Sequence, residues 1–207
     1  MARLMRLNGL GARRRKQYRS TTDSGHNLPV AENLLNRGFA VAGANTVWVS
    51  DITYIPTAEG WLYLCSILDL HSRRVVGWSM SSRMTSDLVV KALLMAMMLR
   101  RPPQGLIFHS DRGSQYCSHV FPRWARCYGI RQSMSCKGDC RDNVPGESFF
   151  ETLKAELYGH RAFWSRQEAR TAIFEYIEVF YNRVRLHCSL GYRSPAEYEH
   201  QSVLGAA

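Results

Sequence analysis

The sequence has no long apolar run, no secretory leader and no regular cysteine framework. Its most apolar stretch, residues 88–99, contains Lys91 and is far shorter than the roughly 20 residues that span a bilayer. We therefore expect no membrane-spanning helix. No apolar segment follows the N-terminal arginines, as a secretory leader would require. The six cysteines form no CxxC pair, which favours reduced thiols in the cytoplasm and no zinc site.

Acidic residues are also scarce. The chain has 17 Asp and Glu against 27 Lys and Arg, and its formal charge is +10. Residues 1–19 hold seven basic residues and no acidic one, including Arg13, Arg14, Arg15 and Lys16. A basic arm of this kind is typical of proteins that bind nucleic acid, so we expect DNA as partner and a nucleoid-associated location. An acidic membrane surface and an organellar transit peptide are the alternatives, but no amphipathic apolar face accompanies the charge.

The length and composition predict one folded domain behind that arm. With 207 residues, 45% of them hydrophobic, the chain can bury a core without disulfides or metals. Residues 1–45 are predicted to be a basic arm and linker, a remnant of a longer N-terminal region. Residues 46–200 are predicted to form the domain, and residues 201–207 a short tail.

The hydrophobic pattern predicts the order β-β-β-α-β-α-β-α-α. We expect strands at 47–55, 61–70, 73–80, 106–108 and 130–133, and helices at 86–100, 119–128, 145–157 and 167–182. Three linked strands followed by α/β crossovers fit an α/β fold with a mixed five-stranded sheet flanked by helices. The first and fourth strands would then be neighbours. Large aromatic side chains expected in the core are Trp48, Trp61, Trp78 and Phe149.

Three acidic residues occupy unusual positions in this pattern. Asp51 lies within the first strand, Asp111 lies just past the fourth, and Glu147 opens a helix. Taken singly, they fit a strand-end cap, a turn former and a helix N-terminal charge. Taken together, converging carboxylates favour a site for Mg²⁺ or Mn²⁺, which prefer oxygen ligands. Two such ions assist phosphoryl transfer in many enzymes.

Several motifs in this order resemble a known family. They are WVSDITY at 48–54, LDLHSRRVVGW at 68–78, HSDRGSQY at 109–116, KGDC at 137–140, DN at 142–143, ESFF at 147–150 and FYNR at 180–183. Thirty-five residues separate Asp111 from Glu147. Across residues 45–199 the chain resembles the retroviral-integrase-like catalytic core of insertion-sequence transposases encoded in two overlapping frames. It is most similar to the second-frame product, OrfB.

The resemblance implies a ribonuclease-H-like fold and a metal-binding catalytic triad of Asp51, Asp111 and Glu147. It implies metal-dependent DNA cleavage and strand transfer, with Lys154 holding a DNA phosphate. It further implies a first-frame partner, OrfA, or a frameshift fusion with it, and a homo-multimer on DNA. OrfB products carry an additional helical segment before the core, so we expect a copy that is truncated or internally started.

Further residues are candidates for supporting roles. Asn143 is expected to cap the helix that bears Glu147, and His109 to orient Asp111 or to serve as a structural histidine. Candidates for contact with DNA are Arg112, Ser114, Gln115 and Arg185, together with the four arm residues named above. For Tyr181, Asn182, Arg185 and His187, packing is the alternative to DNA contact.

Some features depart from the family pattern and leave alternatives open. Gly146 replaces a residue that is usually alanine, at a cost of up to about 1 kcal/mol of helix propensity. A non-catalytic DNA-binding remnant is one alternative function. The other is a ribonuclease-H-type nuclease, which would use the same site to cut RNA–DNA hybrids without joining strands.

Overall fold

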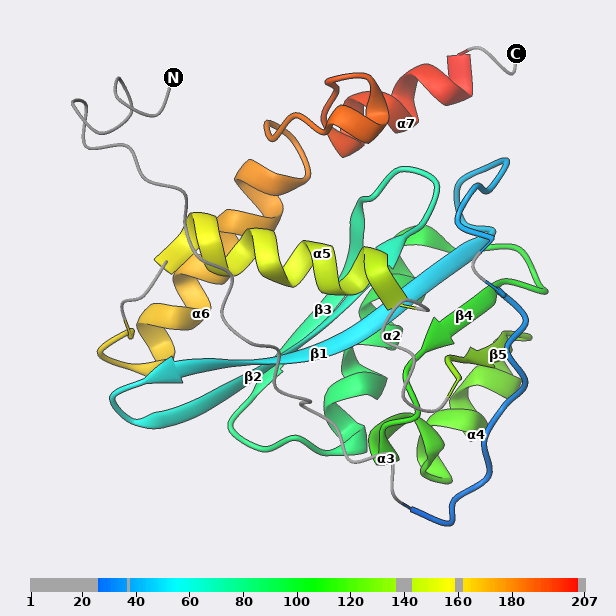
Figure 1. Ribbon diagram of the computed structural model, residues 1–207, viewed down its shortest axis with the longest axis horizontal. Helices are drawn as coiled ribbons and strands as arrows, with labels where there is room; N and C mark the ends of the chain where they lie inside the picture. The colour runs from blue at the N-terminus through cyan, green and yellow to red at the C-terminus, as the bar shows by residue number, and fades with distance from the viewer. Residues whose placement is uncertain (1–25, 37, 137–142, 159–161, 205–207) are drawn as a thin grey trace, which may run out of the picture.

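The computed structural model describes residues 26–36, 38–136, 143–158 and 162–204 (Figure 1). The strands are β1 (Val47–Thr57), β2 (Gly60–Asp69), β3 (Val75–Ser81), β4 (Ile107–Ser110) and β5 (Arg131–Met134). The α-helices are α2 (Ser86–Arg100), α3 (Ser114–Cys117), α4 (Val120–Cys127), α5 (Val144–Leu153), α6 (Arg166–Glu175) and α7 (Pro195–Leu204). Two π-helical segments, η2 (Lys154–Tyr158) and η3 (Tyr176–Tyr181), continue α5 and α6, and a 3₁₀ turn, η4, covers Cys188–Leu190.

The five strands form one mixed sheet in the order β3-β2-β1-β4-β5. The first three pair antiparallel, and β4 and β5 run parallel to β1. Val49 is the register partner of His109 in the β1–β4 pair. The predicted sheet and the predicted contact between the first and fourth strands are confirmed. Asp51 and Asp111 each lie two residues beyond that paired position, on neighbouring parallel segments.

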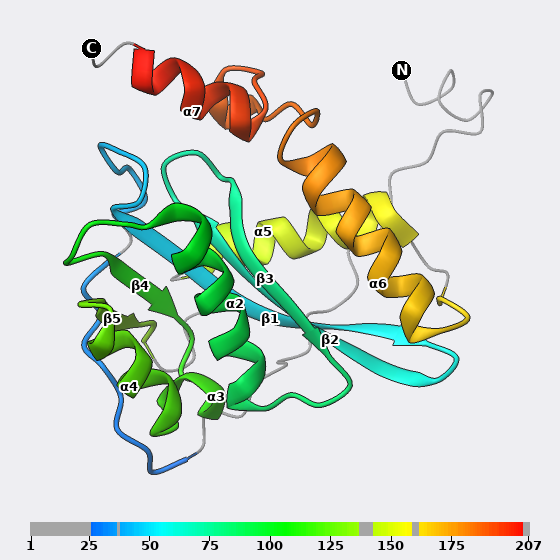
Figure 2. The same cartoon turned by 180° about the vertical axis from the view of Figure 1, so that it is seen from behind.

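Alternation along β1 assigns its side chains to two core layers, because successive strand residues point to opposite faces. Trp48 and Ile52 pack with α2, α3 and α4. Val49 and Ile55 pack with α5, α6 and η3. Figure 1 shows α5 crossing one face of the sheet, and the view from behind in Figure 2 shows α2 and α4 covering the other. Asp51 is two residues from Val49, so its side chain points to the same face of the sheet, the one that α5 covers.

Several expected elements differ from the observed ones. The predicted helix from 145 to 157 is α-helical only to Leu153 and continues as η2, and the helix from 167 to 182 divides into α6 and η3. The short α3 and the C-terminal α7 were not predicted. Both are short, α3 with four residues and α7 with ten, and short helices depend on tertiary packing rather than on a long apolar period.

The four aromatic residues expected in the core differ in burial. Trp78 is only partly buried and packs against the core. Trp48 and Phe149 are fully buried, as predicted. Trp61 is 49% exposed, so its assignment to the core was wrong. Trp61 lies at the start of β2, where the β1–β2 hairpin extends past the rest of the sheet (Figure 1). Its ring packs edge-on against that of Tyr54, with the ring centroids 4.8 Å apart.

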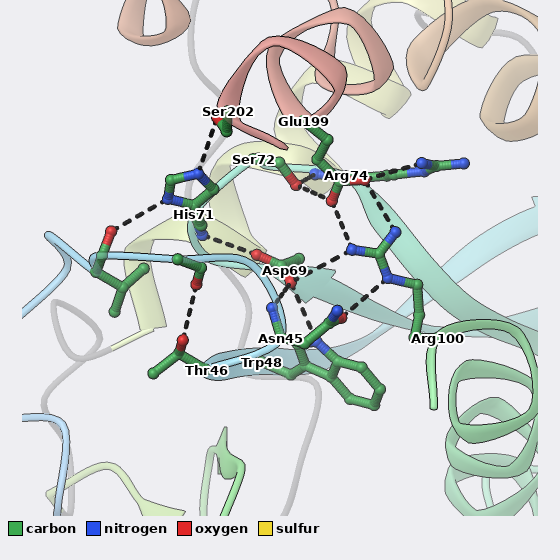
Figure 3. A network of polar contacts seen from close by, with 12 residues as sticks. Asn45, Thr46, Trp48, Asp69, His71, Ser72, Arg74, Arg100, Glu199 and Ser202 are labelled. Carbon is green, nitrogen blue, oxygen red and sulfur yellow. Dashed lines mark hydrogen bonds and ion pairs between the residues drawn. The ribbon is translucent and has the colours of Figure 1, made fainter. Parts of the chain in front are cut away.

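A polar network anchors α7 to the sheet (Figure 3). Glu199 of α7 accepts hydrogen bonds from both terminal nitrogens of Arg100 at 2.8 and 2.9 Å, and from the Ser72 hydroxyl at 2.7 Å. Fully buried Asp69 accepts from the backbone N–H of Asn45 and from the Trp48 indole. Asp69, the acidic residue of the LDLHSR motif, therefore ties the end of β2 to Asn45 and to β1.

No helix in the described part of the chain is long and apolar enough to cross a membrane.

Candidate active site

Asp51 lies in the middle of β1 and keeps partial exposure on the α5 face. Its Oδ1 accepts a hydrogen bond from the Ile52 N–H at 2.7 Å. Burial raises the pKa of Asp51 well above its ordinary value, and the negative charges of Asp111 and Glu147 raise it further. The Ile52 N–H and the positive charge of Lys154 act in the opposite direction. Asp51 is therefore electrostatically coupled to both of the other predicted carboxylates.

Asp111 lies one residue past the end of β4. Its Oδ1 accepts a hydrogen bond from the Gly113 N–H at 2.9 Å, which closes a tight turn before α3. Parallel α/β sheets place their sites at the carboxyl ends of strands, and β4 ends here. The charge of Asp111 contributes to the raised pKa of both Asp51 and Glu147.

Glu147 lies in the first turn of α5. Its pKa is raised by burial first, then by Glu151 one turn further on, and then by Asp111. An acidic residue is favoured in the first turn by the helix dipole. The fold thus brings acidic side chains from a central strand, a strand end and a crossing helix into electrostatic interaction.

Two residues set the close approach of α5 to β1. A Cβ added at Gly146 would lie 3.2 Å from the Cβ of Asp51, so glycine allows the helix to lie against the strand at the site. Asn143 occupies the N-cap position of α5, but its side chain makes no capping hydrogen bond. Its Nδ2 donates to the Ser50 carbonyl at 3.3 Å instead. The expected capping role is thus corrected: Asn143 ties the helix start to the strand.

The three carboxylates form an oxygen donor set that fits a hard divalent cation. Besides burial, the charge of Asp111 raises the pKa of Asp51 and Glu147, and the charge of Glu147 raises that of Asp51, an excess of negative charge that a bound cation would offset. Among the residues that the structure describes, no group of three or more His, Cys, Asp or Glu side chains is arranged as a ready-made metal cage. The fit to a divalent cation therefore rests on the oxygen chemistry and the charge of these carboxylates.

Lys154, the first residue of η2, lies beside this acidic group. Its ammonium nitrogen is 5.1 Å from the centroid of the Tyr54 ring, within the range of a cation–π contact. Burial lowers the pKa of Lys154, while the charges of Asp51 and Glu151 raise it. The structure thus brings this predicted basic residue to the site.

The other predicted residues lie in different environments. Buried His109 bonds through Nδ1 and Nε2 to the hydroxyls of Ser133 and Ser135 on and beside β5. Arg112 donates from Nε to the Ser135 carbonyl at 2.7 Å. Buried Gln115 donates to the Met84 carbonyl at 3.3 Å. These four contacts link the segment around Asp111 to the surrounding core.

The remaining residues that were predicted to contact DNA have different surroundings. Ser114 opens α3 with partial exposure. Arg185 forms an ion pair with Glu156 at 3.0 Å, while Asn182 donates to and accepts from the backbone of Val75. Tyr181 packs on Phe149 with centroids 4.8 Å apart. For Tyr181 and Asn182 the structure therefore favours packing. Arg13, Arg14, Arg15 and Lys16 lie outside the described residues.

Sequence reasoning missed several residues around the site. Glu151 lies four positions after Glu147, and this i, i+4 spacing was the available signal. Tyr54, beneath Lys154, shares the strand of Asp51. Under β1, the Ser50 hydroxyl bonds the Tyr116 hydroxyl at 2.8 Å, and only the tertiary fold brings those two together.

A mixed sheet in this strand order, with carboxylates on β1, after β4 and on α5, is the architecture of an integrase-like catalytic core. Two family models, both described as integrase core domains, match residues 42–140 and 147–203. The chain is 50% identical over 198 residues to a 31 kDa protein of insertion element IS600 from Shigella sonnei, covering 96% of this chain and 73% of the relative. It is 45% identical over 203 residues to transposase InsF of insertion sequence IS3fB from Escherichia coli K12, covering 98% and 70%. The chain belongs to the IS3-type family of insertion-sequence transposases.

Solved structures agree on the fold. The HTLV-2 integrase catalytic core domain in complex with magnesium has a TM-score of 0.59 at 18% identity, covering 78% of this chain and all of that one. A chain of the simian T-cell lymphotropic virus intasome has a TM-score of 0.64 at 19% identity, covering 86% of this chain and 61% of that one. The predicted ribonuclease-H-like fold is confirmed.

Proposed function

We propose that this chain is the catalytic subunit of a DNA transposase, which cleaves phosphodiester bonds at the ends of its insertion sequence and joins them to target DNA. The observation that carries the proposal is the convergence of Asp51, Asp111 and Glu147 from three separate elements into one electrostatically coupled group. The membership in a transposase family supports the DNA substrate.

The same three carboxylates would hold Mg²⁺ or Mn²⁺, two ions in our proposal. When bound, these ions supply charge stabilisation for the attacking and leaving oxygens of the phosphodiester. The raised pKa values of Asp51 and Glu147 support this assignment, because mutual repulsion is the state that a bound cation relieves. In a related fold, the HTLV-2 core was solved with magnesium.

Basic side chains would position the DNA around these carboxylates. Lys154 interacts electrostatically with Asp51, and its ammonium would bind a phosphate beside the reacting bond. Arg112 and Ser114 follow Asp111 closely in the sequence and would add further phosphate contacts. Such contacts to phosphate hold the backbone in register without reading bases. The basic arm, residues 1–19, would add attraction that is independent of sequence.

We also propose that the chain acts as a multimer, together with a first-frame partner or a fusion to it. An apolar groove of about 470 Å³ between η2 and α6–η3, lined by Leu157, Ala172 and Val179 among others, supports self-association. Val179 in its lining and Phe174 nearby on α6 are about half exposed, and exposed apolar patches of this kind mark protein interaction surfaces.

The proposed site is tested by three single substitutions, Asp51→Asn, Asp111→Asn and Glu147→Gln. Each should lower the rate of nicking of insertion-sequence-end DNA in Mg²⁺ or Mn²⁺ by at least about 10²-fold, because each removes a charge from the metal-binding set. The matched control is Asp87→Asn, an exposed carboxylate paired with Lys91 on α2, which should keep the wild-type rate. An unchanged rate in the Asp111→Asn variant would refute the assigned site.

The same assay separates the alternative functions. Wild-type protein that binds end DNA and leaves it uncut with both metals would be a non-catalytic remnant. Protein that cuts RNA–DNA hybrids and never joins DNA strands would be a ribonuclease-H-type nuclease. Cleavage followed by strand joining is the outcome that the proposal requires.

A further inference from the structure

Residues 26–35, here called the strap, cover the free edge of the sheet. The strap runs beside β5, the last strand in the sheet order (Figure 1). The Met134 N–H of β5 donates to the Glu32 carbonyl at 3.3 Å, and the Leu34 N–H donates to the Ser133 hydroxyl at 2.9 Å. The strap thus satisfies edge groups that would otherwise be open to pairing. Leu35, its last residue, is buried in the core.

The beginning of the strap reaches the loop that carries Asp111. His26 Nε2 lies 2.7 Å from the carbonyl oxygen of Arg112, although 86 positions separate the two residues. The Leu28 N–H donates to Nδ1 of the same ring at 3.2 Å. Because Nδ1 accepts a hydrogen bond, the neutral ring carries its proton on Nε2. The Nε2–H then donates a hydrogen bond to the Arg112 carbonyl.

Arg112 is therefore held at both ends. Its carbonyl accepts from His26, and its Nε donates to the Ser135 carbonyl at 2.7 Å. Asp111 precedes it, and the Gly113 N–H that follows it donates to the Asp111 carboxylate at 2.9 Å. A shift of the Arg112 backbone would change the direction of this N–H and of the carboxylate that accepts it.

We propose that His26 is a positioning residue for Asp111 and that the strap is the element that fixes the direction of this carboxylate. This inference rests on the proposed function, in which Asp111 binds the metal. Supporting hydrogen bonds around metal ligands orient them and strengthen binding.

A matched pair of substitutions isolates the contact. In His26→Gln, the side-chain amide nitrogen extends as far as the original Nε2 and can donate to the Arg112 carbonyl. In His26→Asn, the shorter side chain can still accept from the Leu28 N–H but does not reach Arg112. The control His200→Asn changes an exposed histidine on α7.

Two measurements on the full chain follow. The first is amide hydrogen exchange across residues 110–117 in metal-free protein, which does not depend on activity. His26→Asn should exchange faster there than the wild type and the same in β2, while His26→Gln should match the wild type. The second is the Mn²⁺ concentration that gives half-maximal cleavage of end DNA. His26→Asn should raise it about tenfold, with unchanged KM for DNA and unchanged melting temperature.

The outcomes distinguish this inference from the proposed function. If the wild type cleaves DNA and His26→Asn matches it in exchange and in Mn²⁺ dependence, the positioning role is wrong and the transposase proposal stands. If the wild type does not cleave and His26→Asn still loosens residues 110–117, the strap contact stands and the proposed function fails. Equal losses in the Gln and Asn variants would also overturn the inference, because Gln retains the donor.

Discussion

Two opposing effects act on the pKa of Lys154 at the candidate site. Burial disfavours its charged form, while Asp51 and Glu151 favour it. In return, Lys154 lowers the pKa of Asp51, against the burial and like charges that raise it. The face of Tyr54 adds a further favourable contact with the cation. A single side chain thus connects the acidic group to the place where we expect a DNA phosphate.

Replacing Lys154 by Gln should therefore weaken DNA binding and slow cleavage. We expect the slope of log affinity against log salt to become shallower by about one, because one phosphate contact is lost. Lys91→Gln is the control, since Lys91 is an exposed lysine paired with Asp87 on α2. Equal salt slopes for the two variants, measured by fluorescence anisotropy, would contradict the role given to Lys154.

At the scale of elements, α5 and α7 are attached to the sheet by different chemistry. Helix α5 approaches β1 closely because Gly146 has no Cβ and because Asn143 bonds the Ser50 carbonyl. The absence of a side chain at Gly146, which lowers helix propensity, is what permits the approach. Helix α7 is anchored through Glu199, which bonds Arg100, Ser72 and Arg74 (Figure 3).

Glu199 makes the stability of this attachment dependent on pH. Its hydrogen bonds to Arg100 and Ser72 hold the pKa of its carboxyl below the ordinary value of 4.5 in spite of burial. A carboxyl with a lowered folded-state pKa stabilises the fold above its unfolded pKa, and this stabilisation is lost as the pH falls through the folded value. We therefore expect Glu199→Gln to cost about 2 kcal/mol at pH 7 and progressively less below pH 4.5.

Urea unfolding of the wild type and of Glu199→Gln across pH 3 to 7 measures this difference. Burial raises the pKa of neighbouring Asp69, and this acts on the pH dependence of stability in the opposite direction to Glu199. The quantity to compare is therefore the difference in unfolding free energy between the wild type and Glu199→Gln at each pH. Glu197→Gln, an exposed change on the same helix, should leave stability nearly unchanged. A Glu199→Gln deficit that stays constant down to pH 3 would contradict the assignment.

At the scale of the whole molecule, charge is divided unequally along the chain. Residues 1–19 carry seven basic and no acidic residues, against 20 basic and 17 acidic in the rest. The fold places Lys154 next to the acidic group, and Arg112 directly follows Asp111. Basic residues are thus both dense at the start of the sequence and present beside the candidate site.

Deleting residues 1–19 should lower DNA affinity and flatten its dependence on salt. Seven phosphate contacts would change the slope of log affinity against log salt by at most about six, and fewer contacts would change it less. The rate of cleavage at saturating DNA should change little, because the carboxylates remain in place. A salt slope identical to that of the full chain would refute a DNA-binding role for the arm.

The pattern of the sequence predicted the sheet well because strand periodicity is local. Strand order followed from three linked strands and two crossovers, and the β1–β4 contact placed Asp51 beside Asp111. Trp61 was assigned to the core from its residue type, and the extended β1–β2 hairpin left it half exposed. Asn143 was expected to cap α5 from its position, whereas its side chain bonds a strand that lies 93 positions away.

The sequence by itself determined the fold class, which depends on local periodicity, and its motifs indicated the family. It also singled out three acidic residues as candidates for the site. Only the tertiary structure decided which side chains meet across long separations. His26 lies against Arg112, Lys154 over Tyr54, and Glu199 against Arg100. Such contacts depend on the register of strands and the packing of helices rather than on local preference, so no window of the sequence contains them.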